Sequence, residues 1–280
     1  MRGRTFFLYT ALAFGLAFLY GPILSLVIYS FNASELVTVW AGFSTRWYGE
    51  LLRDRQVLSA AWLSVRIAVV VATIAVTLGT LAGMALARHG RFLGRTFFTG
   101  LITGPLVMPD VIIGISLLLL FVTLAEAIGW PASRGMNTII IAHATFCMAY
   151  VAVVVQSRLS GVDRSMEEAA MDLGARPVKV FFTITLPLIA PALIAGWLLS
   201  FTLSLDDLVI ASFVSGPGSS TLPMVIFSKV RLGVEPTVNA LATIIVGIVT
   251  FAVVVSGVLM HRAEKRRQAD IQNAMREAGY

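Results

Sequence analysis

The chain has 280 residues and a mass of 30.2 kDa; 58% of the residues are apolar and 13% are charged, the formal net charge is +6, and the mean hydropathy is +0.87. Soluble domains carry roughly 45–50% apolar and about 25% charged residues, so too few polar side chains remain here to cover a surface in contact with water. This composition excludes a cytosolic globular enzyme, a secreted disulfide scaffold and a disordered adaptor, and it indicates an integral membrane protein, whose single cysteine also rules out an intrachain disulfide and a multi-cysteine metal site.

Six apolar stretches are long enough to cross a bilayer, whose hydrocarbon core takes about 20 residues of helix. The first is too long for the apolar region of a signal peptide and lacks a small-residue cleavage site, so we expect it to remain as a span. Pro105 and Pro109 interrupt the third stretch, and Pro187 and Pro191 lie near the start of the fifth. The sequence therefore predicts an all-α polytopic membrane protein with a single transmembrane domain over residues 1–280 and spans at about 5–30, 58–87, 97–128, 138–156, 184–213 and 240–260.

Lysine and arginine residues are distributed unequally between alternate loops. Fourteen of them fall before the first span, between the second and third, between the fourth and fifth, or after the sixth, whereas six fall in the other loops. Because positive charge marks cytoplasmic loops, we expect both termini to be cytoplasmic. Topology and contact with anionic lipids of the bilayer account for the basic pI, so nucleic acid is not an expected partner.

Aromatic residues gather in the loop between the first and second predicted spans. Trp40, Trp47 and Tyr48 lie in or beside residues 43–52, a stretch that fits a short interfacial helix. Such residues commonly anchor a protein at the membrane interface, which is the interpretation we favour. Stacking on a ligand or a partner is the alternative.

The loop between the fourth and fifth predicted spans, residues 157–183, is long, charged and patterned. It contains a helix whose first turn holds Glu167 and Glu168, where the positive end of the helix dipole favours carboxylates. Gly174 supplies a stop, and Pro177 permits a second short helix to begin. A helix that lies on a membrane surface usually carries Lys and Arg on its polar face. The acidic face here therefore favours docking on a protein partner over contact with lipid.

The same loop and the start of the fifth predicted span share a spaced pattern of seven residues: Glu168, Ala169, Ala170, Gly174, Ile184, Leu186 and Pro187. This pattern resembles the EAA motif of the membrane subunits of bacterial ABC importers. In that family the motif forms coupling helices that sit in a cleft of the ATPase subunit and transmit its closure to the membrane helices. The resemblance implies the type I importer permease fold, and it implies that an ATPase is contacted by Glu167, Glu168, Ala169, Ala170, Asp172 and Gly174.

The chain has no G-x4-G-K-[ST] phosphate loop and so no nucleotide cradle of its own. Energy must therefore come from another polypeptide. We expect ATP and Mg²⁺ to be bound by the ATPase subunit, and this chain to hold no cofactor and no metal.

Three carboxylates lie within or at the end of predicted spans, where ionisable groups are costly and mark functional sites. Asp110 lies deep in the third span, directly after a proline. Asp206 and Asp207 end the LSLDD run of the fifth, and Thr202 lies on the same helix face as Asp206. Carboxylates along one path favour a cation as cargo. Alternatively, Asp110 caps a half-helix, and the aspartate pair contacts Arg66 or lies in the interface.

Four stretches resemble the membrane subunits of bacterial polyamine importers: VIYSFNAS, GPLVMPDVI, EEAAMDLGA and FTLSLDDLVIASFVSGPGSSTLP. The similarity covers nearly the whole chain and is greatest to the second permease of putrescine systems. It implies an inner-membrane translocation subunit, not an enzyme, that moves putrescine, a dication at neutral pH, by alternating access. It also implies three protein partners: a second, different permease, an ATPase homodimer and a periplasmic substrate-binding protein.

Other functions remain as alternatives. A permease of the same family for spermidine, a ferric complex or an oxyanion is the first, although the three carboxylates would repel an oxyanion. A proton-coupled secondary transporter would not need an acidic docking surface. A membrane enzyme would need a catalytic constellation, yet the three histidines are scattered, and we interpret His143 as a hydrogen-bonded core residue. Arg66 has no assigned role, because a fixed cation beside the path would repel a dication.

Overall fold

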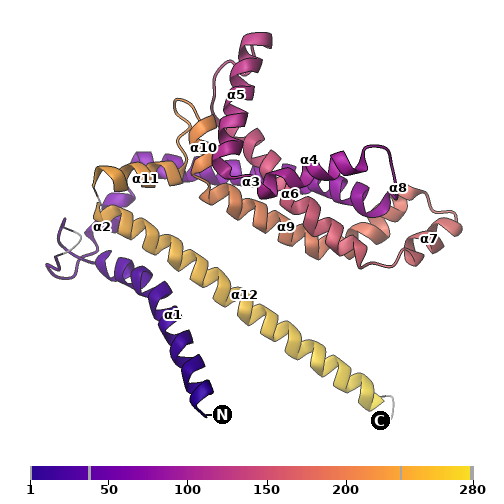
Figure 1. Cartoon of the computed structure of the whole chain (residues 1–280). Helices are drawn as coiled ribbons and strands as arrows, with labels where there is room; N and C mark the ends of the chain where they lie inside the picture. Colours follow the sequence, from indigo (N-terminus) through magenta and orange to yellow (C-terminus); the bar gives the residue numbers. More distant parts are fainter. Residues whose placement is uncertain (1, 37–38, 234, 278–280) are drawn as a thin grey trace. The chain divides into compact units, whose positions relative to one another are not determined.

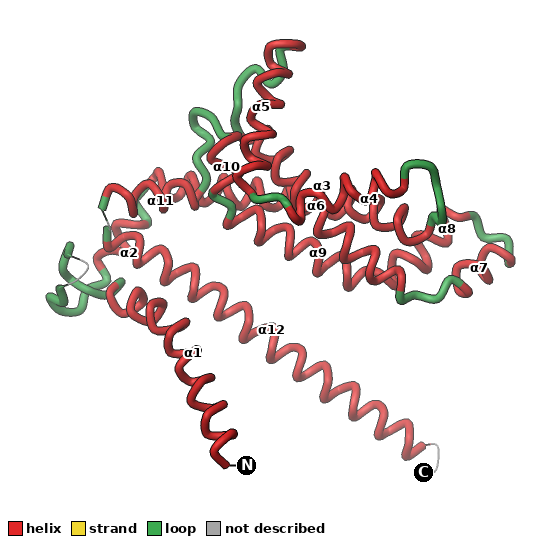
Figure 2. The backbone as a smooth tube through the Cα atoms, in the orientation of Figure 1, coloured by secondary structure: helices red, strands yellow, loops and turns green. Residues whose placement is uncertain are grey.

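A computed structural model describes residues 2–36, 39–233 and 235–277 of the chain. Over these residues the elements are helices joined by loops, and Figure 2 shows no strand among them. One isolated bridge pairs Asn32 with Phe43. The all-α prediction is therefore confirmed. The chain divides into two compact units: Met1–Asp54 with Lys229–Tyr280, and Arg55–Ser228.

Three long helices form the core of the second unit, and Figure 1 shows them side by side: α3 (Arg55–Arg88), α6 (Met136–Ser160) and α9 (Leu186–Asp206). Glycines allow α3 to approach α6 closely. A Cβ atom on Gly79 would lie 2.6 Å from Cβ of Val151, and one on Gly83 would lie 2.7 Å from the carbonyl oxygen of Ala152. Close backbone approach of this kind is how helices associate inside membranes, where burial of apolar surface gives no advantage over lipid.

The third predicted span is two helices, α4 (Arg95–Val107) and α5 (Asp110–Ile128), and α5 leaves the direction of α4 in Figure 1. Met108 is extended, with ψ of 137°, because the ring of Pro109 disfavours helical geometry in the preceding residue. Pro105, in contrast, lies inside α4. Only the second of the two prolines therefore breaks the helix.

The fifth predicted span begins earlier and ends earlier than its apolar stretch. It starts with α8 (Pro177–Val180), continues through the π-helical turn η1 (Phe181–Thr185) and ends with α9 at Asp206 rather than at Phe213. The missing N–H of Pro187 removes a helical hydrogen bond next to the π turn. After Asp207, which is extended with ψ of 125°, the short helix α10 (Val209–Val214) begins and packs along α5.

The first unit contains α1 (Arg2–Tyr29), α2 (Arg46–Leu51) and α12 (Pro236–Glu277), and α12 packs against both of the others. α12 continues beyond residue 260, where the predicted span ends, because the polar segment that follows contains no proline or glycine before Gly279. α11 (Leu222–Leu232) contains the boundary between the units.

Five of the described helical segments are long and apolar enough to span a membrane: Thr5–Tyr29, Arg55–Arg88, Asp110–Ile128, Met136–Ser160 and Pro177–Asp206. A sixth, shorter apolar segment, Pro236–Phe251, forms the first part of α12. This set matches the six apolar stretches of the sequence in order and approximate position.

Candidate functional site

The 157–183 loop forms a helix, a tight turn and a second short helix. Its first helix, α7 (Ser165–Asp172), follows Asp163, whose carboxylate accepts the backbone N–H of Ser165 at 3.0 Å and its hydroxyl at 2.8 Å. These hydrogen bonds hold the pKa of Asp163 below its ordinary value. Gly174 has φ of +84°, which favours glycine, and α8 starts at Pro177. The stop and the restart lie where the sequence predicted them.

The surface of α7 and of the turn that follows is exposed and mixed in character. Glu168, Ala169 and Asp172 are exposed, and Ala170 is partly so. Large apolar side chains of the same stretch are also exposed, Leu173 by 90% and Met171 by 42%. Acidic groups around small and apolar ones form a surface suited to a protein partner, and we call this the α7 surface.

Glu167 does not belong to the α7 surface. Its Oε1 accepts hydrogen bonds from Nη2 of Arg88 at 2.9 Å and from the hydroxyl of Thr185 at 2.9 Å. The side chains of Glu167 and Arg88 are only 15% and 14% exposed. The six residues grouped by sequence thus separate into one that faces inward and others that face outward.

Two further arginines bind the last carbonyl groups of α3. Arg164, which precedes α7, donates to the carbonyl oxygen of Ala87 at 2.8 Å and to that of Arg88 at 3.2 Å. Arg95, at the start of α4, donates to that of Leu86 at 2.9 Å. Cations near a helix C-terminus satisfy orphan carbonyls and complement the dipole. The 157–183 loop is therefore fixed to the end of α3 in two ways. Arg164 binds backbone carbonyls of α3, and Glu167 binds the side chain of Arg88.

A second polar cluster lies at the far end of α9 from this loop. His143 of α6 is 1% exposed, with Nδ1 2.9 Å from the hydroxyl oxygen of Ser204 and Nε2 3.1 Å from Oδ2 of Asp207. All groups are satisfied when Nε2 carries the proton and Ser204 donates to Nδ1. His143 is thus a hydrogen-bonded core residue, as predicted.

Asp207 also fixes the chain after α9. Its carboxylate accepts the backbone N–H of Ile210 at 3.3 Å and that of Ala211 at 2.7 Å, and its side chain is 12% exposed. It therefore joins the end of α9, the start of α10 and α6. This explains why the helix ends before the apolar sequence does.

The remaining carboxylates of the predicted path are exposed. Asp206 and Thr202 lie one turn apart on the same exposed face of α9, as expected from their spacing. Asp110 is the first residue of α5, exposed and at the positive end of that helix. Within the described residues, Asp110 forms no hydrogen bond or ion pair with Asp206, Asp207 or Arg66. Arg66 is itself exposed on α3 beside a small cavity.

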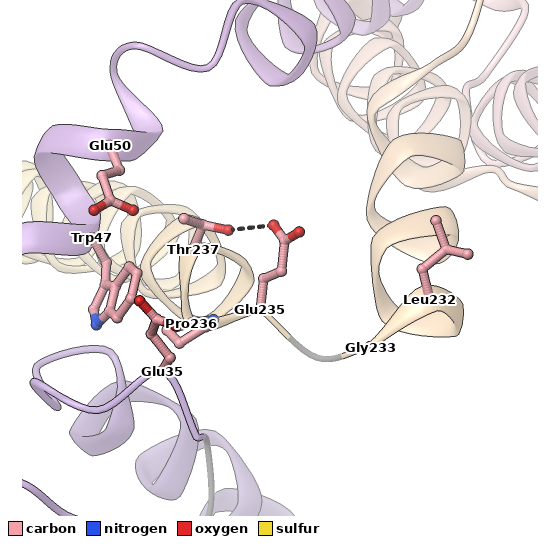
Figure 3. A pocket seen from close by; sticks show the side chains of 8 residues that line it. All are labelled: Glu35, Trp47, Glu50, Leu232, Gly233, Glu235, Pro236 and Thr237. Carbon is pink, nitrogen blue, oxygen red and sulfur yellow. Dashed lines mark hydrogen bonds between the residues drawn. The ribbon is translucent and has the colours of Figure 1, made fainter.

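The first unit contains a cavity of about 510 Å³ lined partly by carboxylates (Figure 3). Glu35 and Glu50 contribute to it, but each forms an ion pair with Arg46, at 3.0 and 3.3 Å. Glu235, which also lines it, accepts a hydrogen bond from Lys229 at 3.0 Å. These acidic groups already have cationic partners, so nothing here marks the cavity as a cargo site.

Trp47 is a packing residue of the first unit rather than an exposed anchor. It is 4% exposed, its Nε1–H donates to the carbonyl oxygen of Asn32 at 2.6 Å, and the Arg46 guanidinium lies 4.1 Å from its ring centroid. The interfacial interpretation is therefore wrong for Trp47. Trp40, which is 50% exposed, fits it better.

Comparisons with known proteins agree on one family. Residues 75–269 match the family described as the binding-protein-dependent transport system inner membrane component. The chain is 66% identical over 265 residues to the putrescine transport system permease protein PotI of Escherichia coli strain K12, covering 95% of this chain and 94% of the relative. It is 42% identical over 256 residues to the spermidine/putrescine transport system permease protein PotC of the same strain, covering 91% of this chain and 94% of the relative.

Solved structures share the fold. A chain of a bacterial ABC transporter that imports the acidic polysaccharide alginate superposes with a TM-score of 0.71 at 19% identity, covering 92% of this chain and 96% of that chain. A chain of the MetNI methionine ABC transporter in an inward-facing conformation gives a TM-score of 0.57 at 17% identity, covering 79% and 99%. At these identities the likeness establishes the arrangement of helices alone.

Proposed function

The chain belongs to the family of binding-protein-dependent transport system inner membrane components, and we propose that it is the membrane-spanning subunit of an ATP-driven importer that moves putrescine from the periplasm to the cytoplasm. The observation that carries this function is the 66% identity to PotI over 95% of the chain. The protein is a multi-pass inner-membrane permease and not an enzyme.

The importer has three other kinds of subunit: a second, different permease, a pair of ATPase chains and a periplasmic substrate-binding protein. A solved relative of this fold, the alginate transporter, is in complex with a periplasmic protein. We assign the binding of ATP and Mg²⁺ to the ATPase chains, because this sequence lacks a phosphate loop.

The α7 surface is the part of the chain that we assign to the ATPase, and both termini then lie in the cytoplasm with it. Glu168 is available for a basic group of the ATPase, and the small side chains of Ala169 and Ala170 allow close approach. The exposed Leu173 supplies apolar area at the same place. Acidic and apolar groups presented together give such an interface both orientation and affinity.

The cargo passes along the exposed face of α9 in this proposal. Asp206 and Thr202 offer oxygen atoms that replace part of the hydration of an ammonium group. Asp110 presents a third exposed carboxylate at the break between α4 and α5, the kind of interrupted helix that lines transporter sites. We assign Asp207 to holding the helix ends in place, because its carboxylate is already bound by His143 and two backbone N–H groups.

A permease for spermidine is the second candidate, favoured by the 42% identity to PotC. Uptake of radiolabelled putrescine into proteoliposomes that contain the complete complex, with unlabelled spermidine as competitor, separates the two. ATP-dependent uptake that unlabelled putrescine abolishes at lower concentration than spermidine supports the proposal. Preference for spermidine would assign the chain to the second candidate, and uptake of neither would contradict both.

A further inference from the structure

A single carboxylate joins three elements at the base of the 157–183 loop. Glu167 lies on α7, Arg88 is the last residue of α3, and Thr185 ends the π turn that leads into α9. Oε1 of Glu167 accepts from both partners, each at 2.9 Å. One atom thus binds α7 to the end of α3 and to the π turn that leads into α9.

This bridge is sheltered from solvent. Thr185 is 5% exposed, and the side chains of the ion pair are about equally sheltered, at 14% and 15%. Nε of Arg88 is buried and has no hydrogen-bond partner among the described residues. Loss of the Glu167 carboxylate would therefore leave Nη2 of Arg88 without its acceptor, in addition to Nε. The Arg88 guanidinium would also lose the charge that neutralises it.

Stabilisation of the fold is not a sufficient reason for an Arg88–Glu167 ion pair at this place. A buried ion pair gains little over an apolar pair of the same volume, because desolvation of the two charges offsets their attraction. What an ion pair adds is a fixed geometry, since a misplaced charge is costly. The bridge fixes α7 relative to the ends of α3 and α9, which are the elements that a push on α7 would reach.

We propose that Glu167, held by Arg88 and Thr185, is a positioning residue of the transport cycle: it transmits movement of α7 to α3 and α9 together, whereas the neighbouring Glu168 makes the contact with the ATPase. This inference rests on the proposed function, because it assumes that an ATPase moves α7. It assigns the two adjacent glutamates to different tasks, one inside the loop and one on its surface.

The test measures coupling rather than activity alone. The complete importer is reconstituted in proteoliposomes with Glu167→Gln, which preserves the shape of the side chain but removes its charge. Three quantities are recorded: the ATPase retained on purification, the rate of ATP hydrolysis, and the putrescine taken up per ATP hydrolysed. We expect full retention of the ATPase and about a five- to tenfold lower uptake per ATP, since substitutions in a coupling network alter coupling by roughly that factor.

Reversal of the pair, Arg88→Glu with Glu167→Arg, should recover part of the lost coupling, which a general loss of folding would not do. Thr185→Val removes one hydrogen bond without a charge and should lower uptake per ATP by a smaller factor. Thr185→Val is the variant to measure if Glu167→Gln fails to assemble. Glu126→Gln, which neutralises an exposed carboxylate on α5, is the matched control for loss of charge.

Unchanged uptake per ATP in Glu167→Gln, or in Thr185→Val if only that variant assembles, would overturn the proposal. Glu168→Gln is purified in parallel as the variant of the contact residue. Loss of the ATPase from Glu167→Gln to the same extent would also overturn the proposal, because Glu167 would then be a contact residue. Measurements on the unsubstituted complex distinguish failure of this proposal from failure of the proposed function. If it hydrolyses ATP but moves no putrescine, the proposed cargo is wrong, and the coupling ratio is then measured with the solute that it does carry.

Discussion

Two pairs of adjacent acidic residues, one on α7 and one at the end of α9, each combine a bound carboxylate with an exposed one. In Glu167–Glu168 the first residue is bound by Arg88 and Thr185, and the second is exposed. In Asp206–Asp207 the first is exposed, and the second is bound by His143 and two backbone N–H groups. In each pair one carboxylate holds the protein together, and only the other is available to a partner or a cargo.

The comparison shows that adjacent charges of like type do not act as a unit. Successive residues on a helix point about 100° apart, so Glu167 can be sheltered while Glu168 faces outward. Asp207 is extended after the end of α9, and its side chain is bound inward while that of Asp206 is exposed. A buried carboxylate must be paired, and once paired it has little capacity left for a ligand. Substitution of the inward residue should therefore affect stability or coupling, and substitution of the outward one should affect binding.

The largest effect is expected from the inward residue of the aspartate pair. Asp207→Ala removes the acceptor of three hydrogen bonds and leaves the buried Nε2–H of His143 without an acceptor, at an expected cost of about 2–5 kcal/mol in the free energy of unfolding. Unfolding in mixed detergent measures it. Asp206→Ala, at the exposed neighbour, should stay within about 0.5 kcal/mol. Equal losses of unfolding free energy in Asp207→Ala and Asp206→Ala would show that the two aspartates do not differ in their structural role.

The outward residue of the glutamate pair should affect assembly without affecting folding. Glu168→Lys reverses a charge that we place against a basic group of the ATPase, and such a change is expected to cost about 2–4 kcal/mol of binding, or at least roughly thirtyfold in affinity. Titration of the purified permeases with the ATPase measures this affinity. Glu126→Lys, an equivalent reversal on α5, should leave it unchanged. An unaltered affinity in Glu168→Lys would take the α7 surface out of the interface.

The turn that presents Glu168 offers a smaller and purely conformational test. Gly174→Ala forces a side chain into a backbone with φ of +84°, at about 1–2 kcal/mol, and should lower ATP-driven uptake several-fold. Gly161→Ala is a control in the same loop, because φ there is −91° and a Cβ would lie 3.7 Å from the nearest atom, the carbonyl oxygen of Arg158. Similar uptake in both variants would show that the turn has no part in coupling.

The smallest effect is expected at the outward aspartate. Asp206→Asn removes one charge from the path that we propose for the dication. That charge is worth about 1 kcal/mol in a hydrated environment, so the substitution should lower putrescine uptake by about fivefold at unchanged assembly. The rate of uptake at saturating binding protein is the readout. Uptake equal to that of the unsubstituted protein would show that Asp206 has no role in transport.

The sequence predicted the features that depend on local physics. Apolar length marked the membrane helices, Pro109 broke the third stretch, and Gly174 and Pro177 ended and began the helices of the 157–183 loop. The helix end at Asp206 was not predictable from hydropathy, because the sequence stays apolar beyond it. The break depends on a carboxylate that meets His143, 64 residues away in the chain.

The separation of roles within each acidic pair was also beyond the sequence. Arg88 and Glu167 lie 79 residues apart, and neither is unusual for its position: an arginine near the end of a helix and a glutamate near the start of one. Their pairing depends on how α3 and the 157–183 loop pack. Trp47 was misjudged for a related reason, since an aromatic residue near an interface is also a good packing residue when its N–H finds an acceptor.

In the function that we propose, a separate ATPase acts on the α7 surface and drives putrescine through this subunit. Uptake of labelled putrescine is measured in proteoliposomes that contain both permeases and the binding protein, with and without the ATPase and with Glu168→Lys in this chain. We expect uptake only when ATP, the ATPase and an intact Glu168 are all present. Putrescine accumulation at the full rate without the ATPase would contradict it.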